Sequence, residues 1–394
     1  MIASIILGLL GSAQLPPPAP SAAGSSPEAL TVLQPQGPLQ RVEPLRYRFS
    51  FETTINYEPA SGRSNPWRLP LILSGPWSAI DSDGISIALA AGRDAQRMDA
   101  ARAVGPPDPL GEGDITVPIP AVNIWPLKVT VSAVTTTWSS KFDDEAAMRI
   151  DWPASWPSEV AAMRRPSVLI ESDAPIISKA VQELTQGQVR SVPPVQAAKL
   201  LIQYACANFK VGQTRVSRGQ QGQLRGIDVV GAKQAATTGE GSPADLVCLC
   251  VAMLRAADFP ARPVIGIGNV AWGGLDEFGV WGEVYLPECG WTPFNPKMLS
   301  EQSVGTLDAR RRWEYFGTMP RLNRAIPIAW SFAPGNGKDA FDSWAVWGWT
   351  RFLQGAAFPA PIEQGSIPTS SGRFTLNPQR PVPSSVTLTR TSAP

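Results

Sequence analysis

Histidine is absent from all 394 residues of this chain, and this absence excludes several kinds of chemistry. Histidine is the most frequent general base in proteins and the commonest ligand of transition metals, because its pKa lies near neutrality. A Ser–His or Cys–His pair is therefore excluded within the chain. A metal site would need carboxylates alone, and no suitable cluster of carboxylates occurs, so we expect no metal and no other cofactor.

The chain also lacks an excess of either charge. Its 34 basic and 33 acidic residues leave a net charge of +1. Nucleic-acid binding depends on a basic surface, so we expect no nucleic-acid partner. The apolar run within residues 1–13 has about nine residues, against about 20 for a membrane-spanning helix. The sequence therefore predicts no stable transmembrane segment.

Four cysteines are too few and too irregularly spaced for a zinc or redox motif. They are Cys206, Cys248, Cys250 and Cys289. Cys248 and Cys250 lie in one apolar run, which indicates buried structural thiols. A disulfide between Cys206 and Cys289 is an alternative in an exported protein, but no sequence pattern supports it.

Prolines and small residues mark the ends of the chain. Residues 1–13 resemble a secretory signal peptide, although no basic residue precedes Arg41. Residues 14–40 are rich in Pro, Ala and Ser, which is typical of an extended linker. Residues 355–394 are rich in Pro, Ser and Thr and are predicted to form a disordered tail. We therefore expect an exported, periplasmic protein.

Residues 41–152 contain six short runs with the alternation of β-strands, separated by Gly, Pro, Ser and Asp. The runs are LRYRFSFETTINYE, RLPLILSG, GISIALAAG, DITVPIPAV, PLKVTVSAVTTTW and AMRIDWP. Their close spacing predicts an antiparallel β-sandwich. This domain is a spacer for the next one in one interpretation and a recognition module in another.

The stretch from Gly239 to Lys297 has the strongest pattern. Apolar residues from Asp245 to Ala257 predict a buried helix, with Ser242 as its cap and Pro243 in its first turn. The runs ARPVIGIG and VWGEVYL that follow predict two strands. The unit is therefore a buried helix that leads into a sheet.

Three blocks of this stretch resemble the transglutaminase-like superfamily, whose fold is related to that of papain-like cysteine peptidases. The blocks are RAADFPAR at 255–262, GVWGEVYLP at 279–287 and GWTPFNP at 290–296. The resemblance covers about residues 166–334. It implies an α+β fold, with a transglutaminase-like core at residues 166–335 behind the N-terminal β-sandwich.

The positions of the family's Cys–His–Asp triad hold other residues in this chain. Counting from RAADFPAR places the nucleophilic cysteine at Pro243, or at Ser242 if the turn is shifted by one. The histidine falls on Gly279 and the aspartate on Asn295. Proline offers no nucleophile and glycine offers no base, while asparagine can orient a catalytic base. The resemblance therefore implies a degenerate, catalytically inactive member, a pseudoenzyme.

Three functional hypotheses remain open. The first is a module that binds a peptide or protein ligand outside the cytoplasm, in a cleft framed by Arg262, Trp281, Glu283 and Trp291. Glu283 and Arg262 are expected to form a structural ion pair. The second is an acyl-transferring or hydrolytic enzyme with substitute chemistry, using Ser242 or a repurposed carboxylate such as Glu240 or Asp245. The third is an assembly module with tryptophans at an interface, and the oligomeric state is left open.

A run of three arginines follows the core. Arg310, Arg311 and Arg312 lie next to aromatic residues, beginning with Trp313. One interpretation is a solvated face with salt bridges. The other is an anchor for a carboxylate, such as a peptide terminus, because a guanidinium group binds carboxylates through two parallel hydrogen bonds.

Overall fold

The computed structural model describes residues 34–56, 67–72, 74–81, 86–91, 96–99, 103–104, 112–117, 127–167, 169–213, 216–218, 224–227, 229–268, 279–302, 306–330, 332 and 369–378. The signal-like segment at 1–13 and most of the predicted linker at 14–40 lie outside these residues, as does most of the tail at 355–394.

The N-terminal part is built on two long antiparallel strands, β1 (Leu39–Asn56) and β8 (Leu127–Phe142). The register runs from Leu39 opposite Phe142 to Ile55 opposite Leu127, with an irregularity after Val42. The segment VTVSAVTTT in β8 explains its length, because β-branched residues pack well on a pleated sheet.

Further strands extend this pair into a six-stranded sheet in the order β17-β1-β8-β4-β5, with β3 beside β8. The added strands are β3 (Ser78–Ile80), β4 (Ser86–Ala91), β5 (Gln96–Asp99) and β17 (Thr369–Pro378). A separate three-stranded sheet contains β2 (Trp67–Ile72), β6 (Ala103–Val104) and β7 (Glu112–Val117). All of these pairings are antiparallel.

Two details differ from the sequence-based expectations. The run AMRIDWP, predicted as a sixth strand, forms no strand; its first residue, Ala147, ends the short helix α2. Residues Thr369–Pro378, inside the range predicted as a disordered tail, form β17 and pair with β1 from Tyr47 to Asn56. An edge strand of this kind is set by its distant partner and not by local composition.

The second part of the chain is helical and contains a small sheet. Its helices are α2 (Asp144–Ala147), α3 (Ser158–Ala161), α4 (Pro175–Thr185), α5 (Pro194–Ala207), α6 (Ala232–Thr238), α7 (Pro243–Ala256) and α8 (Pro296–Glu301). The 3-10 turns are η2 (Ala162–Arg164), η3 (Val189–Ser191) and η5 (Leu322–Arg324). Within the described residues, no helix combines the length and the apolar character needed to cross a membrane.

The sheet of this part is antiparallel, in the order β15-β14-β13-β16. It contains β13 (Ala261–Gly268), β14 (Gly279–Leu286), β15 (Gly290–Phe294) and β16 (Ala325–Ala329). Two small pairs lie outside it: β10 (Val216–Arg218) with β11 (Leu224–Ile227), and β9 (Lys210–Val211) with β12 (Glu240–Gly241). The mixture of helices and antiparallel strands is an α+β arrangement, as the sequence predicts.

Helix α7 lies at the centre of this part and packs against β13 and β14. Nearly all of its residues are buried, as expected for an apolar run without a polar face. The sheet behind it packs closely: a Cβ atom on Gly282 would lie 2.2 Å from the Phe294 ring. The predicted helix and both predicted strands are confirmed at their expected places.

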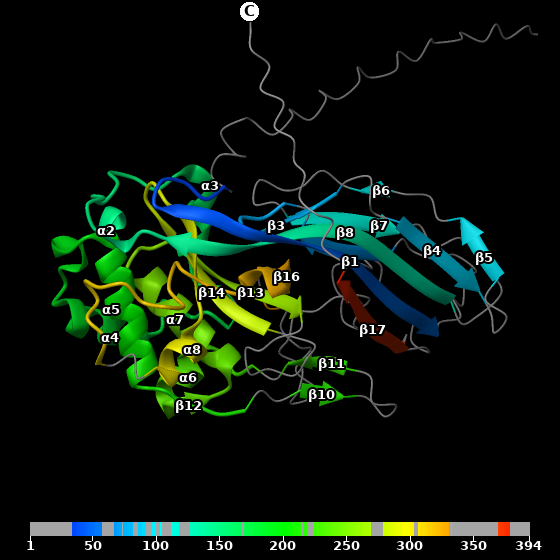
Figure 1. The fold of residues 1–394 in the computed structure, drawn as a ribbon. Coiled ribbons are helices and arrows are strands. Elements are labelled where there is room, and N and C mark those ends of the chain that lie inside the picture. The colour runs from blue at the N-terminus through cyan, green and yellow to red at the C-terminus, as the bar shows by residue number, and fades with distance from the viewer. Residues whose placement is uncertain are drawn as a thin grey trace, which may run out of the picture.

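Figure 1 shows α4 to α8 gathered at one end of the molecule and β4, β5 and β17 at the other, with β1 and β8 running between them. Hydrogen bonds join β8 to the segment before β16. The Thr137 hydroxyl donates to the Asn323 carbonyl oxygen (2.5 Å), and the Asn323 side chain donates to the Glu43 carbonyl oxygen (2.6 Å). The Met319 N–H donates to the Ser140 hydroxyl (3.0 Å). The long strands are thus attached directly to the helical part.

Candidate functional site

The amino end of α7 is the position where the sequence places the nucleophile. Ser242 is its N-cap and Pro243 its first residue. The Asp245 N–H donates to the Ser242 hydroxyl oxygen (3.2 Å), and the Ser242 N–H donates to Asp245 Oδ2 (2.9 Å). This reciprocal pair is a capping box, so the cap predicted from the sequence is confirmed.

The Asp245 carboxylate also ties a neighbouring loop to the helix. Its Oδ1 accepts hydrogen bonds from the N–H groups of Val230 (2.7 Å) and Gly231 (3.3 Å). Its Oδ2 accepts the Ser242 hydroxyl at 2.7 Å. Asp245 is 2% exposed and Ser242 is 5% exposed. Four donors therefore converge on one buried carboxylate, and both side chains hold the chain in place.

This arrangement limits what Ser242 can do chemically. A serine becomes a nucleophile when a base accepts its proton while its oxygen attacks the substrate. Here the base within reach is Asp245, whose oxygens already accept backbone N–H groups. The Ser242 oxygen itself caps the helix. Attack by this oxygen would require the capping box to open.

The other two triad positions lie at the ends of neighbouring elements. Gly279 is the first residue of β14, and Asn295 is the N-cap of α8. The Asn295 side-chain oxygen accepts a hydrogen bond from the Met298 N–H (3.2 Å). The backbone N–H of Asn295 donates to the Tyr315 carbonyl oxygen (2.9 Å). Asn295 is 2% exposed. Its side chain therefore stabilises α8, a role that differs from orienting a base.

The four residues expected to frame a cleft lie inside the core, which corrects that expectation. Arg262, Trp281, Glu283 and Trp291 are all 1% exposed or less. Arg262 lies opposite Glu283 in the pairing of β13 with β14, and each of two guanidinium nitrogens lies 2.7 Å from Glu283 Oε2. The structural ion pair predicted from the sequence is present, but it borders no open surface.

Two tryptophan rings enclose the charged end of Arg262. Its guanidinium carbon lies 3.9 Å from the centroid of the Trp291 ring and 3.7 Å from that of Trp330. Burial raises the pKa of the Glu283 carboxyl from its ordinary value, while the Arg262 charge and a hydrogen bond from Trp281 act in the opposite direction. Trp330, which joins this cluster directly after β16, was not predicted, because nothing in the local sequence pattern connects it to Arg262.

The four cysteines are free and buried. Burial raises the pKa of Cys248 and of Cys250 well above the ordinary value, and raises the pKa of Cys289 to about 12. The thiolate is the reactive form of cysteine, so none of these three is activated as a nucleophile. The prediction of buried structural thiols is confirmed for Cys248 and Cys250, and the alternative Cys206–Cys289 disulfide is not formed.

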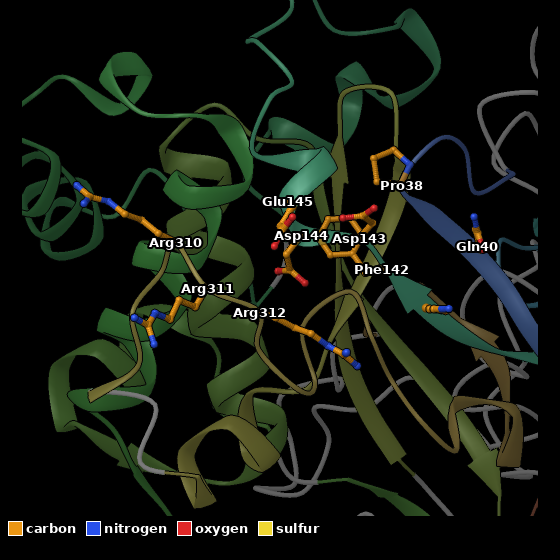
Figure 2. A pocket seen from close by; sticks show the side chains of 10 residues that line it. Pro38, Gln40, Phe142, Asp143, Asp144, Glu145, Arg310, Arg311 and Arg312 are labelled. Carbon is orange, nitrogen blue, oxygen red and sulfur yellow. The ribbon is translucent and has the colours of Figure 1, made fainter.

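No group of three or more Cys, Asp or Glu side chains that could hold a metal ion occurs in the part of the chain that the structure describes. A cavity lined by charged residues lies in another part of the structure. This cavity of about 580 Å³, which Figure 2 shows from close by, is lined by Pro38, Gln40 and residues 141–145 and 310–312. We call it the charged cavity. The three arginines are evident in the sequence, whereas the acidic residues that line the same cavity are recognised only in the structure.

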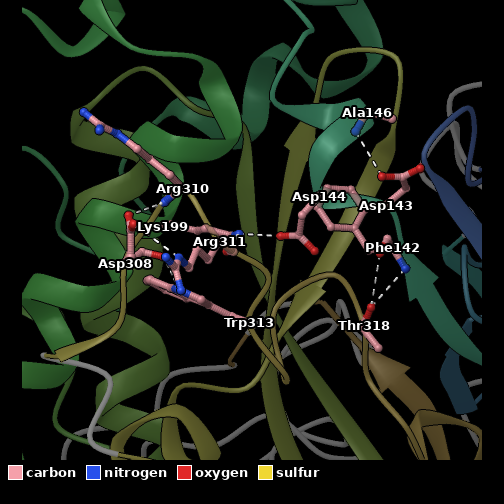
Figure 3. A network of polar contacts seen from close by, with 10 residues as sticks. All are labelled: Phe142, Asp143, Asp144, Ala146, Lys199, Asp308, Arg310, Arg311, Trp313 and Thr318. Carbon is pink, nitrogen blue, oxygen red and sulfur yellow. Dashed lines mark hydrogen bonds and ion pairs between the residues drawn. The ribbon is translucent and has the colours of Figure 1, made fainter.

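The charged cavity adjoins a buried ion pair. Lys199 and Asp144 form a short hydrogen bond, and the Lys199 ammonium also donates to the Arg311 carbonyl oxygen at 2.7 Å (Figure 3). Burial raises the pKa of Asp144 and lowers the pKa of Lys199, and each charge opposes the shift of the other. The ammonium also lies 5.3 Å from the ring centroids of Trp313 and Phe316. Lys199 therefore fixes α2 and the arginine segment to α5.

Comparison with known proteins supports the core assignment. Residues 179–296 match the model of the transglutaminase-like superfamily. No curated protein sequence matches the chain. A proposed cysteine protease of Cytophaga hutchinsonii is similar in structure with 12% identity, a TM-score of 0.46, and coverage of 86% of this chain and 90% of that one. The periplasmic domain of TgpA from Pseudomonas aeruginosa has 13% identity, a TM-score of 0.32, and coverage of 65% and 91%.

Proposed function

We propose that this chain, whose residues 179–296 form a transglutaminase-like core, is a non-catalytic member of that superfamily which binds a peptide or protein ligand outside the cytoplasm. The observation that carries the proposal is the lack of histidine in the whole chain together with Pro243 at the nucleophile position. Acyl transfer by this superfamily's kind of chemistry requires a cysteine nucleophile and a histidine base, and the matching positions hold Pro243 and Gly279.

The hydrogen bonds at the two remaining polar positions support the same proposal. Ser242 and Asn295 both serve as helix N-caps, and both are buried. Their side-chain oxygens accept backbone N–H groups that would otherwise lack a partner. The elements that would carry a catalytic triad are thus retained as structure.

The second candidate is an acyl-transferring or hydrolytic enzyme with substitute chemistry at Ser242. One contact favours it: the Ser242 hydroxyl donates to Asp245 Oδ2 at 2.7 Å, which is the geometry of a hydroxyl and its base. The other three hydrogen bonds on the same carboxylate argue against it, because they compete for the oxygens that would receive the proton.

The test is incubation of the purified full chain with glutamine peptides, ester substrates and cell-wall peptide fragments, followed by mass spectrometry. The Ser242→Ala variant is the matched control, because it removes the hydroxyl alone. We expect no change of mass in any substrate for either protein. Turnover that disappears in Ser242→Ala would replace the proposal with the serine-enzyme alternative.

Export to the periplasm is part of the proposal and rests on residues 1–13, which resemble a signal peptide. Fractionation of cells that express the full chain tests it. We expect the protein in the periplasmic fraction with its first residues removed, as read by mass spectrometry of the intact protein. Recovery of the uncleaved chain in the cytoplasm would contradict it.

A further inference from the structure

We propose that the charged cavity binds the C-terminus of a peptide that ends in a basic residue, with the terminal carboxylate at Arg312 and Lys141 and the side-chain ammonium at Asp143 and Asp144. The inference names the ligand class of the proposed peptide-binding function and therefore rests on it. The cavity lies apart from the triad positions and is lined by none of them.

The cavity has walls from three segments that are far apart in the sequence. They are the start of β1, the end of β8 with α2, and the turn at 308–313. The turn is held by its own hydrogen bonds: the Trp313 indole N–H donates to the Asp308 carbonyl oxygen (2.9 Å), and the Arg310 N–H donates to Asp308 Oδ1 (2.9 Å). Trp313 is 1% exposed beneath it. The arginines therefore project from a fixed backbone, which reduces the entropy lost on binding.

Arg312 provides the anion-binding end. Figure 2 shows it extending beneath Asp144 towards the β8 side, whereas Arg310 and Arg311 point the other way. Arg312 makes no hydrogen bond or ion pair with another described residue. Lys141 lines the same cavity and is exposed. A guanidinium group with free N–H donors binds a carboxylate through two parallel hydrogen bonds.

Asp144 provides the cation-binding end. Its side chain is 5% exposed, and Oδ1 is bound by Lys199. Its second oxygen, Oδ2, is buried and has no hydrogen-bond partner among the described residues. Figure 2 shows the carboxylate on the Arg312 side of the cavity. A buried acceptor without a partner is costly, and an ammonium donor from a ligand would satisfy it.

The composition of the walls selects for a ligand with both charges. The lining contains three acidic side chains (Asp143, Asp144 and Glu145) together with Arg312 and Lys141, so an anion alone would meet repulsion from the first group and a cation alone from the second. The volume of about 580 Å³ lies within the usual range of about 300–1,000 Å³ for small-ligand pockets. It suits the end of a peptide and not a folded domain.

The experiment is isothermal titration calorimetry of the full chain with the tripeptide Ala-Ala-Lys. Two analogues change one charge each: the C-terminal amide removes the carboxylate charge, and Ala-Ala-norleucine removes the ammonium. We expect saturable 1:1 binding of Ala-Ala-Lys and at least about tenfold weaker binding of each analogue, since hydrogen bonds to charged groups are the strong ones.

Two variants identify the residues. Arg312→Gln is expected to weaken Ala-Ala-Lys at least about tenfold while leaving the weak binding of the amide unchanged. Asp143→Asn is expected to weaken Ala-Ala-Lys more than the norleucine peptide. Both positions are exposed, so the variants should fold. Arg165→Gln is the matched control, because Arg165 is an exposed arginine outside the cavity lining, and it should leave all affinities unchanged.

Three outcomes would contradict this inference or the proposed function. No binding of Ala-Ala-Lys at about 10 mM would overturn the inference. Binding that is unchanged in Arg312→Gln would also overturn it, yet would leave the proposed peptide-binding function standing. Cleavage or modification of the bound peptide would overturn the non-catalytic proposal, while the loss of affinity in Arg312→Gln would still assign the cavity.

Discussion

Replacing Glu283 by Gln is the perturbation whose effect the structure defines most sharply. The change is nearly isosteric and removes only the negative charge of the carboxyl. It leaves Arg262 buried at 0% exposure between the rings of Trp291 and Trp330. Arginine cannot lose its proton at accessible pH, so its charge would stay in the core without the Glu283 carboxylate.

The expected cost follows from the burial of both partners. Breaking a buried ion pair by removing one partner typically costs about 3–5 kcal/mol. The amide oxygen of Gln can still accept a hydrogen bond from the Arg262 Nε–H, which now lies 2.7 Å from Glu283 Oε2. We therefore expect a loss of about 3 kcal/mol, at the lower end of that range, from a total of about 5–15 kcal/mol.

The assay is urea denaturation followed by tryptophan fluorescence, because three tryptophans surround the pair. The double variant Arg262→Met/Glu283→Leu is the matched control, since it removes both charges and keeps apolar volume. Replacement of a whole buried pair by apolar residues is often close to neutral. We expect the double variant to be more stable than Glu283→Gln, even though it loses the stacking of Arg262 on Trp291 and Trp330.

Two results would refute this reasoning. A loss below about 0.5 kcal/mol in Glu283→Gln is the size expected for an ordinary surface change, and it would mean that the Arg262 charge is not desolvated. A double variant less stable than Glu283→Gln would mean that stacking on the tryptophans, and not pairing with Glu283, stabilises the guanidinium group. Either result would change the interpretation of the whole cluster.

The other predictions concern helix α7 and the cysteines. No native cysteine should react with iodoacetamide at pH 8 in the folded chain and all four should react in urea, because the fold buries all four thiols. Pro243→Cys, at a half-buried helix N-terminus, should react, and rapid labelling of the native protein would contradict this. Ser242→Ala should cost about 1 kcal/mol as a lost N-cap, and Asp245→Ala should cost more because three backbone N–H groups lose their acceptor, which urea denaturation can compare. Stability should fall as pH rises from 9 towards 12, because the unfolded chain then loses the Cys289 proton while the folded chain, with its pKa of about 12, keeps it. The slope from this thiol is about 1.4 kcal/mol per pH unit, and Cys289→Ala should remove that part of it.

Local patterns were sufficient for the core of the transglutaminase-like part. The cap at Ser242, the proline at position 243 and the apolar run after it predict α7, which the structure confirms from Pro243 to Ala256. The alternation in VWGEVYL predicts β14 in the same way. These elements follow from interactions between residues a few positions apart, so the sequence contains nearly all the information that they need.

Elements that depend on distant partners were not predictable in this way. Strand β17 forms where composition indicates a tail, because the edge of β1 is available to pair with it. The run AMRIDWP has strand-like alternation but contributes no strand. Asp143 caps α2 just before this run, and Asp144 forms an ion pair with Lys199. In both places a tertiary contact outweighs local propensity.

The sequence by itself determined that no imidazole is available to this protein as a base or a metal ligand. The absence of histidine is a fact of composition, and no fold can supply a side chain that the chain does not contain. Only the tertiary structure decided which polar residues are available to a ligand. It places Arg262 and Glu283 in the core. It also brings Arg312 and Asp144, which lie about 170 positions apart in the sequence, to the lining of one cavity. Burial and the approach of charged groups both depend on how distant chain segments pack together.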